Sequence, residues 1–141
     1  MMLYLDNAAT TLKKPLSVYA TLFKSTLFSG GNAGRGGHKM SMDAVRAIVD
    51  TQDLIAQLFN IKKAENIVFT QNATYALNTA ILGTMSNGGH IVVTEMDHNS
   101  VLRPACLPGN YTVVKADKSG YVHAEDVEKA VRKDTKLIVC T

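Results

Sequence analysis

The segment of the chain best suited to chemistry is residues 69–78, where an apolar run passes through a short turn of small and polar residues into an expected helix. The start of a helix presents free backbone N–H groups and a partial positive charge, and both favour a bound phosphate. Thr74 adds a hydroxyl donor at this place. In the alternative interpretation, Asn72 caps an ordinary helix and binds nothing. The pattern alone leaves both interpretations open.

A histidine, His98, comes shortly after the next apolar run, residues 91–94. In a parallel sheet, ligands bind outside the carboxyl ends of the strands. We therefore expect His98 and the turn at Thr74 to lie at the same edge of the sheet. An imidazole there can stack on a ring or move protons. In the alternative interpretation, His98 is a surface or capping residue.

A third polar segment is the glycine-rich loop of residues 30–38. It does not match a dinucleotide-binding fingerprint, because it follows an expected helix rather than a strand, and it does not match a P-loop. Its glycines permit a close backbone approach, and Arg35 and His38 offer donors to a carboxylate. A flexible connection between two helices explains the same residues.

The elements that position these segments are predicted from hydrophobic periodicity and helix boundary signals. Pro15 begins a first helix that ends at residues 29–31, and Ser41 is the expected N-cap of a long second helix. Further helices are predicted at residues 73–82, closed by Gly83 or by residues 87–89, and at residues 124–133, ending in Arg132 and Lys133. Residues 99–106 are predicted to form a short helix or turn. Strands are predicted at residues 67–70, 91–94, 111–114 and 137–140, with a short strand or edge segment at residues 3–5.

Apolar strands separated by helices predict an α/β fold, with a mostly parallel sheet and helices on both faces. Residues 1–63 are expected to form an N-terminal arm and helical layer, and residues 64–141 the sheet and its helices. Because parallel strands are buried on both faces, we expect the hydrophobic core of the chain to lie around the sheet.

Composition and charge exclude several classes of function. Of the 141 residues, 46% are hydrophobic and 19% charged, which is the balance of a globular protein. The net charge of +3 is scattered along the chain, so we expect no nucleic-acid partner. No apolar run approaches the roughly 20 residues that span a bilayer, and the first residues lack a signal-peptide pattern, so we expect a cytoplasmic protein without membrane contact. Cys106 and Cys140 lack metal-ligand spacing, so they are expected to be reduced thiols and no metal site is predicted.

Four blocks, in order and at matching distances, resemble the class V aminotransferase and cysteine desulfurase family of fold-type I pyridoxal-phosphate (PLP) enzymes. They are residues 4–11, 31–38, 72–78 and 95–104. The resemblance covers nearly the whole chain. One departure is Tyr75, where many relatives carry an acidic residue.

This resemblance implies a role for each block. Ala73 and Thr74 would bind the PLP phosphate, and His98 would lie over the pyridine ring and assist proton transfer. His38 and the pair Ala8 and Ala9 would line the substrate side. Residues 64–141 would be part of the large PLP-binding domain.

The resemblance also implies an activity, namely sulfur elimination from cysteine through an external aldimine, by a homodimer acting on a small amino acid. Amino-group transfer is the alternative. The family's Schiff-base lysine, its aspartate facing the pyridine nitrogen and its desulfurase cysteine match nothing here. We therefore expect an N-terminal portion, truncated before that lysine and inactive alone. Two hypotheses from other classes of function remain open. One is a non-catalytic phosphate-binding module, and the other is an interaction or structural remnant without a ligand.

Overall fold

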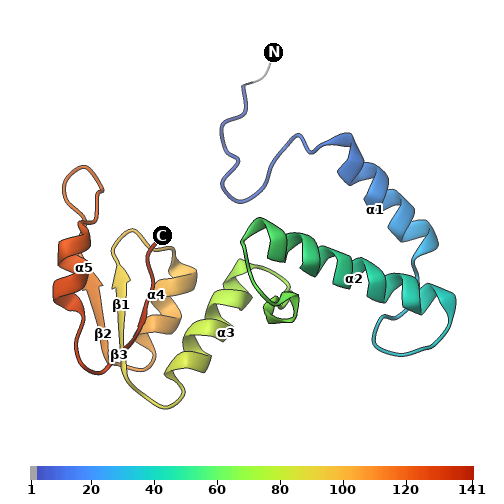
Figure 1. Ribbon diagram of the computed structural model, residues 1–141. Coiled ribbons are helices and arrows are strands. Elements are labelled where there is room, and N and C mark those ends of the chain that lie inside the picture. Colours follow the sequence, from blue (N-terminus) through green and yellow to red (C-terminus); the bar gives the residue numbers. More distant parts are fainter. Residues whose placement is uncertain (1–2) are drawn as a thin grey trace. The chain divides into compact units, whose positions relative to one another are not determined.

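The computed structural model describes residues 3–141 and divides them into two compact units, residues 3–68 and residues 69–141 (Figure 1). In the first unit, the arm before Pro15 is coil with bends, so residues 3–5, predicted as a short strand or edge segment, form no strand. Helix α1 spans Leu16–Phe28, directly after Pro15, whose φ of −54° suits the start of a helix. It ends at Ser29, as predicted.

Helix α2 spans Lys39–Leu58, and its N-cap is His38 rather than the predicted Ser41. The Nδ1 atom of His38 accepts a hydrogen bond from the Ser41 backbone N–H over 3.3 Å. Ser41 lies in the first turn, where it is buried and its hydroxyl donates to the Asn32 carbonyl over 2.7 Å. The prediction failed because an imidazole nitrogen can accept the N–H bond that a serine hydroxyl usually accepts.

The strand predicted at residues 67–70 does not form, which corrects a second expectation. These residues follow the short 3-10 helix Ala64–Asn66 as irregular chain, and Val68 is 79% exposed. The Ile67 carbonyl accepts its hydrogen bond from the Gln52 side chain over 2.7 Å rather than from another strand. An apolar run becomes a strand only where a neighbouring strand completes its ladder.

The second unit alternates helices and strands, as predicted. In chain order it contains α3 (Ala73–Met85), β1 (His90–Thr94), α4 (Asn99–Cys106), β2 (Tyr111–Val114), α5 (Ala124–Ala130) and β3 (Thr135–Ile138). The predicted bounds of α4 and β2 are confirmed. Helix α3 runs through Gly83, and α5 ends before Arg132 and Lys133 because Val131 is already extended, with a ψ of 130°.

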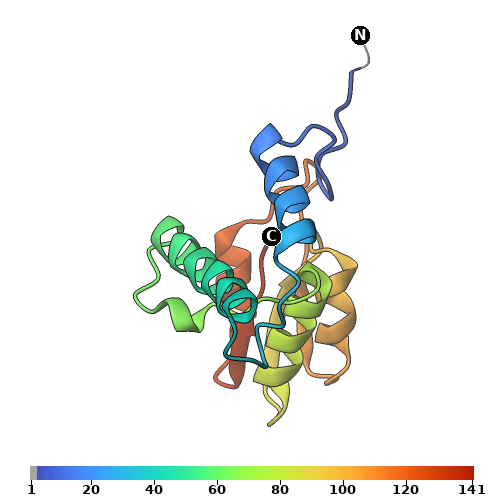
Figure 2. The same ribbon diagram turned by 90° about the vertical axis from the view of Figure 1, so that its right-hand side faces the viewer.

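The three strands form one parallel sheet in the order β2-β1-β3. The connection from β1 to β2 and the connection from β2 to β3 run in opposite directions across the sheet. They keep the same hand only if their helices lie on opposite faces. Helix α4 accordingly lies with α3 on one face and α5 on the other (Figures 1 and 2). The predicted α/β fold, with a parallel sheet and helices on both faces, is confirmed.

The core of this unit lies between β1 and the pair α3 and α4. Ile91 and Val93 point to that side, and they pack with Ile81, Met85, Val101 and Ala105. Alternation along the strand sends His90, Val92 and Thr94 to the face that carries α5. All five residues of β1 are buried, as expected for a central parallel strand.

His90 joins the three strands at the amino end of β1. Its Nδ1 lies 2.8 Å from the Thr135 hydroxyl of β3, and its Nε2 lies 2.9 Å from the Thr112 hydroxyl of β2. Burial lowers the pKa of His90, and the nearby Arg132 charge lowers it further, against a smaller opposite effect of Asp134. The neutral imidazole is therefore favoured in the folded chain. Among the helices of residues 3–141, none combines the length and hydrophobicity needed to cross a membrane.

Candidate cofactor site

The start of α3 carries unused hydrogen-bond donors. Asn72 caps the helix, because its Oδ1 accepts from the Tyr75 N–H over 2.8 Å and its carbonyl accepts from the Ala76 N–H. Within residues 3–141, no acceptor lies on the N–H groups of Ala73 and Thr74 or on the Thr74 hydroxyl. The capping interpretation and the phosphate interpretation are therefore compatible, since the cap leaves the first two amides free for an anion.

His98 lies at the start of the neighbouring helix, where it is the N-cap of α4. Its Nδ1 accepts the Ser100 backbone N–H over 3.1 Å and lies 2.8 Å from the Ser100 hydroxyl. Because Nδ1 is the acceptor, this bond assigns the ring proton of the neutral imidazole to Nε2. No partner for Nε2 lies in the described part of the chain. His98 is therefore a capping residue, as in the alternative interpretation, and also an exposed imidazole whose Nε2–H has no partner among the described residues.

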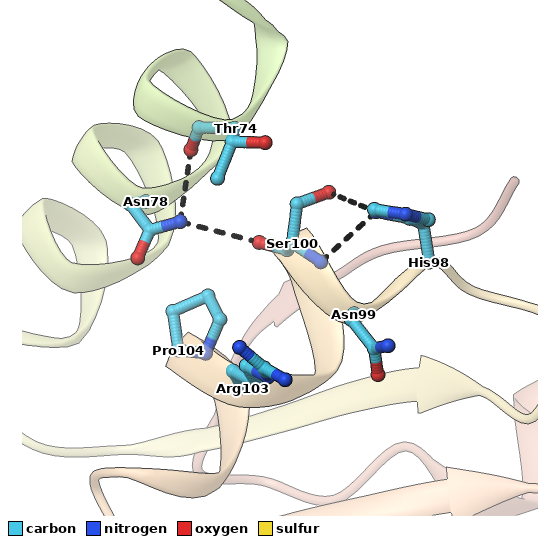
Figure 3. Close-up of a pocket in the computed structure, with 7 residues that line it drawn as sticks. All are labelled: Thr74, Asn78, His98, Asn99, Ser100, Arg103 and Pro104. Atoms are coloured by element: carbon cyan, nitrogen blue, oxygen red, sulfur yellow. Dashed lines mark hydrogen bonds between the residues drawn. The ribbon is translucent and has the colours of Figure 1, made fainter. Parts of the chain in front are cut away.

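Asn78 connects the two helix starts. Its Nδ2 donates to the Thr74 carbonyl over 2.8 Å and approaches the Ser100 carbonyl at 3.4 Å (Figure 3). Four residues after Ser100 comes Pro104, inside α4, and proline has no N–H for the helical bond to that carbonyl. The amide of Asn78 therefore takes the place of the donor that Pro104 lacks. The consequence is that α3 and α4 are joined at the level of Thr74 and His98.

These side chains line a single pocket of about 370 Å³ between the first turns of α3 and α4 (Figure 3). The lining residues are Thr74, Asn78, His98, Asn99, Ser100, Arg103 and Pro104. Its volume falls in the range of small-molecule sites, roughly 300–1,000 Å³. Arg103 adds a positive charge on the α4 side, which favours an anionic ligand. The sequence predicted that Thr74 and His98 would lie at one edge, and the structure brings both into this pocket.

The turn between β1 and α4 is fixed by two acidic side chains. The Oδ2 atom of Asp97 accepts from the Thr94 N–H over 2.7 Å and from its hydroxyl over 2.9 Å. Glu95 accepts from Lys115 and from the Ala116 N–H at the end of β2, each over 3.1 Å. The Lys115 bond is the largest of the effects that lower the pKa of Glu95. This turn is therefore tied to its own strand and to the neighbouring strand.

The other predicted site residues lie in the first unit. Ala8 and Ala9 are exposed coil residues, and His38 caps α2. The predicted close approach of the glycine loop does occur there. A Cβ atom on Gly31 would lie 2.4 Å from the Met40 backbone, so the loop folds onto the start of α2.

Sequence reasoning gave no role to Asn78, Ser100 or Asp97. Asn78 had one available signal, since it is a polar residue one helical turn after Thr74 and therefore on the same face of α3. The sequence signal for Ser100 was weaker: it is a hydrogen-bonding residue two positions after His98, a candidate capping residue. The burial of Asp97 depends on long-range packing and had no signal in the sequence.

A parallel sheet with a pocket between two helix starts at its carboxyl edge is typical of α/β proteins that bind a ligand there. The profile of the aminotransferase class-V family matches residues 3–141. The chain therefore belongs to the aminotransferase class-V family, a family of enzymes.

Curated relatives point to one branch of this family. A probable cysteine desulfurase of Aeropyrum pernix is 34% identical over 96% of this chain and 34% of its own length. The cysteine desulfurase IscS of Dictyoglomus turgidum is 34% identical over 96% of this chain and 36% of its own length. The chain thus spans about a third of these relatives.

Solved structures share the fold. A NifS-like protein superposes with a TM-score of 0.82 at 23% identity, covering 95% of this chain and 38% of its own. A structure of SspA in complex with cysteine gives a TM-score of 0.81 at 26% identity, covering 94% of this chain and 40% of its own. Both agree with the parallel α/β arrangement described above.

Proposed function

We propose that this chain supplies the phosphate-binding and ring-facing side of a PLP site in a cysteine desulfurase. The observation that carries the proposal is the pocket that Thr74, at the start of α3, and His98, at the start of α4, line together. Support for the reaction type comes from the curated relatives, which are named cysteine desulfurases. The residues present fit the cofactor, because its phosphate needs donors and its ring needs a flat side chain.

Each residue has a distinct task in this proposal. The amides of Ala73 and Thr74, with the Thr74 hydroxyl, donate to the phosphate, and the partial positive charge of the α3 N-terminus adds to the attraction. PLP, when bound, supplies the electron sink for amino-acid chemistry. His98 would face the ring, and its Nε2 would hold the proton that moves to or from the reacting atoms.

The substrate and the assembly belong to the same proposal. Cysteine is the proposed substrate, since SspA has been solved in complex with cysteine. Ala8, Ala9 and His38 would line the substrate side, and the working form would be a cytoplasmic homodimer. Amino-group transfer is the second candidate, favoured by the match to the aminotransferase class-V profile.

A phosphate titration tests the binding part of the proposal. Inorganic phosphate, added to the 15N-labelled chain, should shift the amides of Ala73 and Thr74. Thr74→Val removes one donor to a charged acceptor and should weaken phosphate binding about tenfold or more. The matched control is Thr79→Val on the same helix, whose hydroxyl donates to the Tyr75 carbonyl over 2.8 Å outside the pocket. Shifts that spare Ala73 and Thr74, or equal losses in the two variants, contradict the proposed phosphate site.

An activity assay tests the reaction. Protein purified from the organism that encodes it should release alanine from cysteine in the presence of PLP. His98→Phe keeps an aromatic face and removes the titratable nitrogens, so it should retain PLP but lose about 10²–10⁴-fold in rate. Amination of an oxo acid without alanine release would favour the aminotransferase. Phosphate binding without either activity would favour a non-catalytic module.

A further inference from the structure

The carboxylate of Asp97 is the most deeply enclosed acidic group of the site region, with its residue only 5% exposed. Its hydrogen bonds come from two threonines. Thr94 gives its N–H and its hydroxyl to Oδ2, and the Thr141 hydroxyl donates to Oδ1 over 2.5 Å. Thr94 ends β1 and Thr141 follows β3, so one carboxylate ties together the carboxyl ends of two adjacent strands.

His98 is the next residue in the chain, and it is held on its other side by α4. Its carbonyl accepts from the Val101 N–H over 2.8 Å, and its Nδ1 accepts from the Ser100 N–H. The backbone of His98 is extended, with a φ of −66° and a ψ of 156°, and it joins the turn at residues 95–97 to the first residue of α4. The direction of the imidazole is therefore set by the two anchored segments that flank it.

We infer that Asp97 is a positioning residue for His98, because its carboxylate holds the end of β1 in the geometry that lets Nδ1 accept the Ser100 N–H and leaves Nε2–H without a partner among the described residues. The inference rests on the proposed function and deepens it. It assigns to Asp97 the orientation of the imidazole, and to Thr94 and Thr141 the orientation of Asp97.

The carboxylate of Asp97 affects the thiol of Cys140. Burial raises the pKa of the Cys140 thiol, and the negative charge of Asp97 raises it further. Both effects favour the protonated thiol of Cys140 over the thiolate.

Two amides separate a positioning role from a merely structural one. The Thr94 N–H is a direct partner of Asp97, whereas the Ser100 N–H is a partner of His98 only. Asp97→Ala in the ligand-free, 15N-labelled chain should speed hydrogen exchange of both amides about tenfold or more. The His98 nitrogen shifts should move from the Nε2–H tautomer towards a mixture of the two tautomers. Asp97→Asn keeps an acceptor for Thr94 and should restore both the exchange rates and the tautomer.

Asp117→Ala is the matched control. Asp117 also accepts three hydrogen bonds in a turn, from the Ser119 N–H, the Ser119 hydroxyl and the Tyr121 N–H, but it lies beyond β2 and should leave His98 unchanged. Faster exchange at Thr94 with Ser100 and His98 unaltered in Asp97→Ala would overturn the inference, as would an equal response to Asp117→Ala. If Asp97→Ala does not fold, Thr94→Val removes a single donor to the carboxylate, and unchanged His98 nitrogen shifts in that variant overturn the inference. None of these measurements needs PLP, so they stand whether or not the proposed cofactor binds.

Discussion

Replacing Asn78 by leucine tests how the two helices of the pocket are held together. Leucine keeps most of the side-chain volume but cannot donate to the Thr74 or Ser100 carbonyl. The Thr74 carbonyl lies one turn before residue 78 in α3 and keeps the helical bond from the backbone N–H of that residue. The Ser100 carbonyl has no such substitute, because Pro104 occupies the position of its helical donor. The cost of Asn78→Leu should therefore come mainly from Ser100.

The size of this effect follows from the geometry. A buried carbonyl left without a partner costs about 1–3 kcal/mol. The distance of 3.4 Å from Asn78 is long for a hydrogen bond, so the lower end of that range applies. We expect a loss of about 1 kcal/mol in the unfolding free energy of the second unit. Native-state hydrogen exchange of the buried β1 amides measures this quantity for that unit alone.

A double-mutant cycle with Pro104→Ala decides whether the reasoning is right. Alanine at position 104 restores a backbone N–H for the Ser100 carbonyl, so Asn78→Leu should cost little in that background. The expected coupling is about 1 kcal/mol. Equal costs of Asn78→Leu in the two backgrounds would refute the idea that Asn78 replaces the missing donor. Thr79→Val, which removes a side-chain bond confined to α3, should show no coupling with Pro104→Ala.

Three more outcomes are expected. Burial lowers the pKa of His90, so the imidazole of the unfolded chain takes up a proton at a higher pH than that of the folded chain. The unfolding free energy should therefore fall as the pH drops below about 6.5. Urea unfolding of the His90→Gln variant should show a smaller fall. The hydrogen bond from the Ser119 hydroxyl is the largest of the effects that lower the pKa of Asp117 to about 2. The ionised Asp117 should therefore stabilise the fold above pH 3.8, and this stabilisation should disappear as the pH falls towards 2. A carboxyl NMR titration should show that Ser119→Ala raises the pKa of Asp117. Gly31→Ala should destabilise the first unit by about 1–3 kcal/mol in urea unfolding, because its Cβ would overlap the backbone at the start of α2, whereas Gly37→Ala, with open space around it, should not.

The alternation of helices and strands in the second unit could be predicted because its signals are local. The bounds of α4 and β2 follow from residue type and spacing, and β3 begins two residues before the predicted start. The predicted strand at residues 67–70 failed for a different reason. Its apolar residues are typical of a strand, but no second strand pairs with them, and pairing is not a property of the segment itself.

Some residues of the candidate site could be predicted from the sequence, and others could not. Thr74 and His98 could be singled out because each comes near the start of a helix at the carboxyl edge of a parallel sheet. The role of Asn78 depends on a proline in another helix, and the role of Asp97 depends on threonines at the ends of two strands. Pro104 and Thr141 are distant in the sequence from Asn78 and Asp97, so periodicity and capping signals carry no information about these pairs, whereas Thr94 lies only three residues before Asp97.

The central position of β1 has a consequence for the synthesis of the protein. Both neighbours of β1 come later in the chain, and β2 is complete about 20 residues after Thr94. At typical elongation rates, β1 leaves the ribosome with both edges unpaired for roughly 1–4 s. Unpaired edges of an apolar strand attract other chains. Since α3 is made before β1 and packs on one of its faces, this helix can cover the nascent strand before the sheet exists.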